Sequence, residues 1–109
     1  MFHMLSAIKL KTGITVEEFR QSVEAFTAHM QKIDLLHSTS PIGRRRKHPI
    51  MDTDAERDHE YYLIMSFQDR AQCDRAVENI LRHEEPGKSI HQAVFSSIED
   101  PVFTCWEDL

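Results

Sequence analysis

Three segments of the sequence alternate as β-strands do, yet each carries large apolar side chains on both faces. The opposed pairs are Phe2 and Leu5 in residues 2–10, Tyr61 and Tyr62 in residues 59–67, and Val94 and Phe95 in residues 89–98. A sheet built from such strands needs cover on both faces, because a wide apolar face exposed to water favours association. The pattern therefore predicts helices on one face and a further layer on the other.

Two amphipathic helices supply the first of these layers. Thr15 and, three residues later, Glu18 form a reciprocal capping box that starts a helix. The stripe that follows it recurs at steps of three and four: Val16, Phe19, Val23, Phe26, Met30 and Ile33. A second helix starts after Asp69 and stops before Pro86 and Gly87. Its apolar face consists of Cys73, Ala76, Val77, Ile80 and Leu81.

The remaining segments complete the order strand, helix, strand, strand, helix, strand. Pro41 and Gly43 interrupt residues 34–46, which is typical of an irregular strand at a sheet edge. Residues 47–58 are polar and predict a long loop, and residues 89–98 predict the fourth strand, ended by Pro101. The order predicts an α+β, ferredoxin-like fold, a four-stranded antiparallel sheet with two helices on one face. We expect one domain over residues 1–109, with 99–109 a C-terminal tail that docks through Trp106.

The second layer is predicted to be another copy of the chain. A protein of 109 residues buries only part of its apolar surface by folding alone, so a homodimer that closes a barrel would complete the core. A net charge of −5 disfavours nucleic acid as the main partner. No apolar run approaches the roughly 20 residues of a membrane span, and no signal peptide is evident. Cys73 and Cys105 match no metal or redox spacing, so we expect a cytoplasmic protein with free thiols.

Two stretches of sequence carry a resemblance to known proteins. The opening F-H-M-L-S-A-I-K-L-K-T-G-I-T-V-E-E-F resembles the start of the dimeric α/β-barrel proteins, and E-Y-Y-L-I-M-S-F-Q-D extends this resemblance. In particular, the chain is similar to the stress-responsive A/B-barrel branch and, more loosely, to the antibiotic-biosynthesis monooxygenase branch. The whole chain is also similar to a small bacterial family of uncharacterised proteins.

The resemblance implies a barrel of two sheets and a cavity for a small, often aromatic molecule. Some members of these branches are enzymes that use neither metal nor cofactor, so we expect no cofactor and no metal. In active relatives a histidine lies on the first strand and another on the third. His3 lies one residue from the first of these positions, and Tyr61 occupies the second.

The candidate site residues are few. His3, His37 and His91 are candidate catalytic residues, because an imidazole facing a cavity acts as acid or base near neutral pH. The candidate ligand-binding residues are Tyr61, Tyr62, Ser66 and Arg44. For each histidine and tyrosine the alternative is an ordinary place in the core or on the surface.

Charged residues are concentrated around the long loop. Arg44, Arg45, Arg46 and Lys47 precede it, and Asp52, Asp54, Glu56, Asp58 and Glu60 lie in or after it. We interpret the two limbs as neutralising each other in solvent, and the alternative is an anion-binding or nucleic-acid patch. The acidic limb lacks the glycine and the final glutamate of a calcium loop, which excludes that reading.

Three hypotheses for function follow. The first is a dimeric barrel that binds a small apolar or aromatic molecule, either between sheet and helices or inside the dimer. The second is a cofactor-independent monooxygenase, cyclase or isomerase that uses a histidine and a tyrosine in the cavity. The third is a structural or regulatory dimer with a filled interior.

Overall fold

The computed structural model describes residues 1–109 and consists of one antiparallel sheet with a layer of helices. The strands are β1 (Phe2–Leu10), β2 (Ser38–Thr39), β3 (Gly43–Arg44), β4 (Tyr61–Phe67) and β5 (Ile98–Glu107). Their order is β2-β4-β1-β5, and β3 pairs with the first residues of β4 on the same edge as β2. β1 and β4 thus form the centre, and the interrupted segment with Pro41 lies at an edge as predicted. This topology confirms the α+β, ferredoxin-like fold.

The first helix, α1 (Val16–Lys32), follows from its capping sequence and its apolar stripe. The Glu18 backbone N–H donates to Thr15 Oγ1 over 3.1 Å, a cap worth about 1 kcal/mol. Phe19, Val23, Phe26 and Met30 are buried against the sheet. Ile33 was wrongly included in the stripe. It is the C-cap, 39% exposed, because Asp34 turns the chain with a φ of 60° and ends the helix.

The second helix, α2 (Arg70–Leu81), starts at the predicted cap. Asp69 Oδ1 accepts a hydrogen bond of 2.8 Å from the Gln72 N–H. Gln72 is 1% exposed, and its buried amide is satisfied by two backbone groups, the N–H of Gln68 and the carbonyl of Asp34. On the predicted apolar face Ala76 is buried, whereas Val77 and Leu81 remain exposed.

The predicted fourth strand, residues 89–98, is wrong. A third helix, α3 (Gly87–Phe95), takes this segment, and the edge strand β5 comes from the residues expected to form a docked tail. Ile90, Val94 and Ile98 are four residues apart, a spacing that places side chains on one side in a helix and in a strand alike. Pro101 lies inside the strand and does not end it. Proline has no backbone N–H to donate, which a strand at the sheet edge tolerates. The pairing of β5 with β1 also shifts register between Ala7 and Lys9, close to this position.

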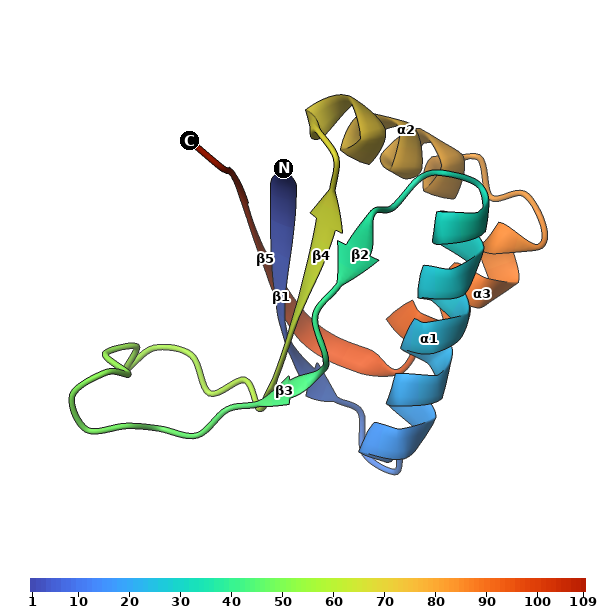
Figure 1. Cartoon of the computed structure of the whole chain (residues 1–109). Coiled ribbons are helices and arrows are strands. Elements are labelled where there is room, and N and C mark those ends of the chain that lie inside the picture. Colours follow the sequence, from blue (N-terminus) through green and yellow to red (C-terminus); the bar gives the residue numbers. More distant parts are fainter.

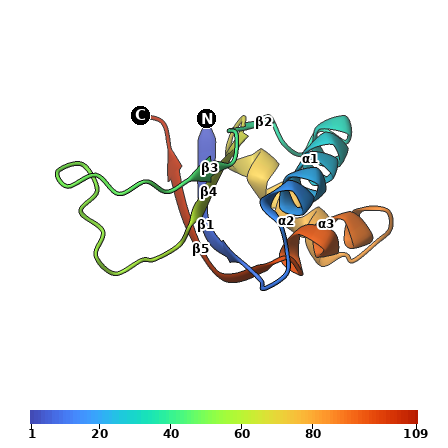
Figure 2. The same ribbon diagram turned by 90° about the horizontal axis from the view of Figure 1, so that it is seen from below.

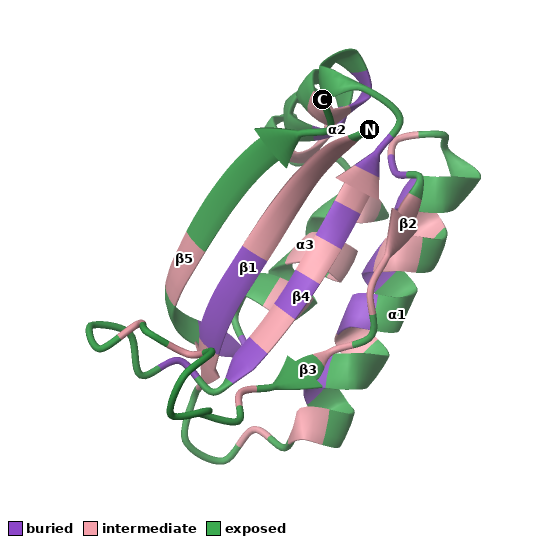
Figure 3. Cartoon of the chain, turned by 60° about the vertical axis from the view of Figure 1, so that its left-hand side comes forward, coloured by how far each residue is buried: buried purple, intermediate pink, exposed green.

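All three helices cover the same face of the sheet, which we call the inner face (Figures 1 and 2). The opposite, outer face carries no element of its own chain (Figure 3). The strand register shows which side chains share this outer face. Leu5 pairs with Ile64 and Thr104, and Ala7 pairs with Tyr62 and Val102. Residues 45–60 form an arm that extends away from the helices, beyond the outer face (Figure 1).

Candidate functional site

A cavity of about 270 Å³ lies between the inner face of the sheet and the helices. The β-strands contribute Met4, Ser6, Ile8, Leu63, Met65, Phe67, Ile98 and Phe103 to its wall, and the helical layer contributes Phe19, Phe26, Met30, Cys73, Ala76, Val77, Ile80, His91, Val94 and Phe95. Leu35 and Leu36 close it near β2. An apolar cavity of about 150 Å³ is enough to bind benzene, so this one has room for a molecule somewhat larger than a single ring.

The wall contains two side chains able to form ordinary hydrogen bonds, Ser6 on β1 and His91 on α3. The His91 ring stacks on Phe95 at a centroid distance of 5.9 Å and meets Phe26 at 5.6 Å. Burial lowers the pKa of His91, and His83 lowers it further, so the imidazole is neutral at pH 7. A neutral imidazole offers one donor and one acceptor nitrogen to a ligand.

The cavity opens between the β5 edge and the ends of α2 and α3. Val77, Phe95 and Phe103 line it and yet are 48%, 54% and 49% exposed, which marks them as its mouth. Cys73 lies on the wall, where burial raises the pKa of its thiol and keeps the sulfur protonated. The mouth therefore presents apolar side chains to solvent, and no charged residue lines the cavity.

His3 and Ser66 come together on the outer face instead of in the cavity. His3 Nδ1 lies 2.7 Å from Ser66 Oγ, and His3 Nε2 lies 2.9 Å from Asp108 Oδ1. The ring of Trp106 lies over His3 at a centroid distance of 5.2 Å. This cluster holds the C-terminal end of β5 to β1 and β4. It also pairs the polar side-chain atoms of His3 and Ser66 on this face.

The other predicted site residues lie apart from the cavity. His37 is exposed beside β2 and hydrogen-bonds Ser38 Oγ at 3.1 Å. Tyr62 is on the outer face, opposite Ala7. Tyr61 points to the inner face beyond the end of the cavity, where Arg44 lies over its ring. Of the seven candidates, His91 alone reaches the cavity, and it does so from helix α3 and not from the strand expected to carry it.

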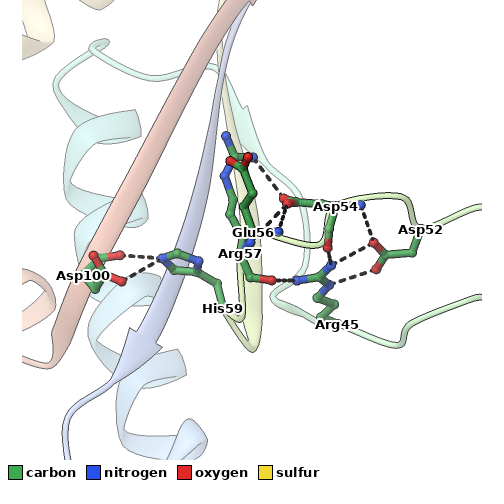
Figure 4. A network of polar contacts seen from close by, with 7 residues as sticks. All are labelled: Arg45, Asp52, Asp54, Glu56, Arg57, His59 and Asp100. Atoms are coloured by element: carbon green, nitrogen blue, oxygen red, sulfur yellow. Dashed lines mark hydrogen bonds and ion pairs between the residues drawn. The ribbon is translucent and has the colours of Figure 1, made fainter.

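The arm is held in shape by Arg45, which is 9% exposed (Figure 4). Its guanidinium binds both carboxylate oxygens of Asp52, at 2.8 and 2.9 Å, and donates to the backbone carbonyls of Asp54 and Arg57. The hydrogen bonds from Arg45 lower the pKa of Asp52. His59 fixes the base of the arm, since its Nε2 lies 2.6 Å from the Asp100 carbonyl on β5. Mutual neutralisation of the limbs is thus confirmed for Arg45, but Arg44 and Arg46 have no acidic partner.

Two residues that complete the cavity mouth and the His3 cluster were not predicted from the sequence. Phe103 at the mouth and Asp108 beside His3 were assigned to a tail. Alternation of Val102, Thr104 and Trp106 with Phe103 and Cys105 was the available signal for a strand there. No group of three or more metal-ligating side chains converges anywhere in the chain. None of its helices is both long and apolar enough to span a membrane.

The sequence matches the Family of unknown function (DUF6614) over residues 1–108, and the chain belongs to this family. A search of the curated proteins gives no match.

Solved structures share the fold at low sequence identity. A protein from Arabidopsis thaliana superposes with a TM-score of 0.73 at 9% identity, covering 99% of this chain and 94% of that one. A cofactor-independent oxygenase of Streptomyces nogalater, SnoaB, gives 0.68 at 11% identity, with 98% and 91% covered. A dimeric ferredoxin-like protein of unknown function from Jannaschia sp. CCS1 gives 0.67 at 12% identity, with 98% of each chain covered. These structures support the dimeric α/β-barrel resemblance as a likeness of fold.

Proposed function

We propose that this protein binds a small, uncharged apolar or aromatic molecule in the cavity between its sheet and helices, and does so as a homodimer. The observation that carries the proposal is the cavity of about 270 Å³, apolar except for Ser6 and His91. Ligand sites typically combine an apolar wall with a few polar groups that fix orientation. A charged ligand would be desolvated there without a counter-ion, which is unfavourable.

The dimer is proposed from the outer face. This face is not covered by a helix, and its apolar surface consists of Leu5, Tyr62, Ile64, Val102 and Trp106. Burying such a surface against its own copy gives a closed, self-complementary pair. The Jannaschia protein with the same fold is described as dimeric, which supports this arrangement.

Binding is favoured over the two alternatives. Catalysis by a histidine and a tyrosine in one cavity requires both groups within hydrogen-bond reach of a ligand, and no tyrosine lines this cavity. A purely structural dimer has no need of a cavity, so the cavity between sheet and helices favours binding over this alternative.

The proposal is tested by titrating the protein with 1-naphthol and following the ligand's fluorescence and the melting temperature. Ala76→Leu places a larger side chain in the cavity wall, where Ala76 is 3% exposed, and should weaken binding at least about tenfold. Ala71→Leu makes the same change at an exposed position of the same helix and should leave affinity unchanged. No saturable binding to the wild-type protein, or equal affinities of the two variants, would contradict the proposal.

A further inference from the structure

We propose a second binding site, separate from the apolar cavity, that takes the phosphate group of a small phosphorylated molecule. It is a concavity of about 200 Å³ lined by Arg20, Arg44, Arg46 and Tyr61 above Val16 and Ile42. Three guanidinium groups and one phenol thus face one small space at the β3 edge of the sheet.

The three consecutive arginines, Arg44 to Arg46, differ in direction and in pairing. Arg45 points into the arm and is fully paired with Asp52 and backbone carbonyls. Arg44 and Arg46 alternate with it along the chain and point to the opposite side, toward α1. No acidic side chain lies within ion-pair distance of either, although the chain has a net charge of −5. Three of the acids of the arm are engaged elsewhere, Asp52 with Arg45, Asp54 with Arg57 and Asp58 with Lys9.

Contacts with Tyr61 orient the guanidinium group of Arg44. The guanidinium carbon lies 5.6 Å from the centre of the Tyr61 ring, and Nη2 lies 3.5 Å from the phenol oxygen. Tyr61 itself is 9% exposed and fixed in the centre of the sheet by pairing with β1 and β3. A stacked guanidinium loses less freedom on binding, because its plane is already oriented.

The third arginine comes from α1. Arg20 lies one turn beyond Val16, the first residue of that helix, so both line the concavity. The positive end of the helix dipole adds to the three cationic side chains. Glu17 pairs with Arg20 on the exposed side of the helix, and an incoming anion would compete with it.

The chemistry and the size of the concavity together select the ligand class. Guanidinium groups bind carboxylates and phosphates alike in a planar, two-bond geometry, but a phosphate group has three acceptor oxygens and can engage several guanidinium groups at once, whereas a carboxylate has two and a halide is a single atom. A long polyanion would need basic residues spread along a surface, whereas here they converge on one small space in an otherwise acidic protein.

The test is a titration of the ¹⁵N-labelled full chain with inorganic pyrophosphate at low salt. We expect saturable shifts of the amides of Val16, Arg20, Arg44 and Arg46. The double variant Arg44→Gln, Arg46→Gln should weaken binding at least about tenfold. The matched control Arg75→Gln, Arg82→Gln removes the same charge from exposed positions at α2 and should weaken it less than twofold.

A third variant separates geometry from charge and guards against misfolding. Arg44→Lys with Arg46→Lys keeps both charges but loses the planar fork, and we expect a loss of at least about threefold. The proposal is overturned if the control weakens binding as much as the Gln pair does, if the Lys pair binds like the wild type, or if pyrophosphate fails to bind at millimolar concentration. Tighter binding of a single-stranded RNA 12-mer than of pyrophosphate would overturn it too.

Discussion

The two faces of the sheet differ in how their apolar side chains are covered. The inner face is packed under three helices of its own chain, with Phe19, Phe26 and Met30 at most 6% exposed, and still encloses a cavity. The outer face has apolar residues of similar size but no covering element, and three of its polar side chains, those of His3, Ser66 and Asp108, hydrogen-bond to one another. Our proposal accordingly assigns the small molecule to the inner side and a second copy of the chain to the outer face.

The largest expected effect comes from a charge on the outer face. Ile64→Asp should turn a dimer into a monomer, because a buried unpaired carboxylate costs about 3–5 kcal/mol, or roughly a hundredfold or more in the dissociation constant. Sedimentation equilibrium measures this constant. Val77→Asp introduces the same charge on the helical side, where Val77 is 48% exposed, and should leave the dimer intact. Equal dissociation of both variants would remove the distinction between the faces.

A core truncation on each side sharpens the comparison. Phe26→Ala on the inner face should lower the free energy of unfolding by about 3–5 kcal/mol at any protein concentration, because its contacts lie within one chain. Ile64→Ala should lower it by an amount that grows as the protein is concentrated, since part of its contact is with the partner. Urea unfolding at two protein concentrations checks both expectations. If the loss of unfolding free energy in Ile64→Ala did not depend on protein concentration, the outer face would be exposed to solvent and not covered by a partner.

A smaller effect is expected from the polar group of the cavity. His91→Phe keeps a flat ring between Phe26 and Phe95 but removes the nitrogen atoms, so the affinity for 1-naphthol should fall about two- to tenfold, the value of one hydrogen bond. The affinity for naphthalene, which has no hydroxyl group, should not fall. The ratio of the two affinities, from competitive fluorescence titrations, is the readout, and an unchanged ratio would exclude His91 as the orienting group.

The smallest effect is a pH dependence. Burial lowers the pKa of His91 in the folded state, so the unfolded chain binds the proton more readily there. Stability should therefore decline as pH falls below about 6.5, the pKa of an unperturbed histidine. In His91→Phe this part of the decline should be absent, which urea unfolding at pH 7 and pH 5.5 would detect. An identical decline in both proteins would place the responsible group elsewhere.

Much of the inner layer could be predicted from sequence. Thr15 and Glu18 locate the start of α1, and the spacing of Phe19, Val23 and Phe26 gives its buried face. These features are local, and propensity, capping and periodicity all agree on them. The outer face was also anticipated from β1 and β4, which are apolar on both sides, whereas the third pair, Val94 and Phe95, lies in α3 and not in a strand.

The C-terminal third could not be assigned correctly, because its signals are ambiguous. Ile90, Val94 and Ile98 fit a helix and a strand equally, and Pro101 was taken as a terminus although it lies inside β5. His91 lines the cavity, but it was placed on the wrong element. The mouth of the cavity and the partner of His3 depend on pairing between β1 and β5, residues about 100 positions apart, which periodicity does not reveal.

The most direct test of this account is a crystal structure of the protein with 6-bromo-2-naphthol, located by the anomalous signal of bromine. We expect one bromine peak per chain between the sheet and the helices, with the naphthol oxygen near His91 or Ser6, and the outer face covered by a twofold-related copy. A peak on the outer face, or an unoccupied cavity in a chain whose outer face meets only solvent, would contradict it.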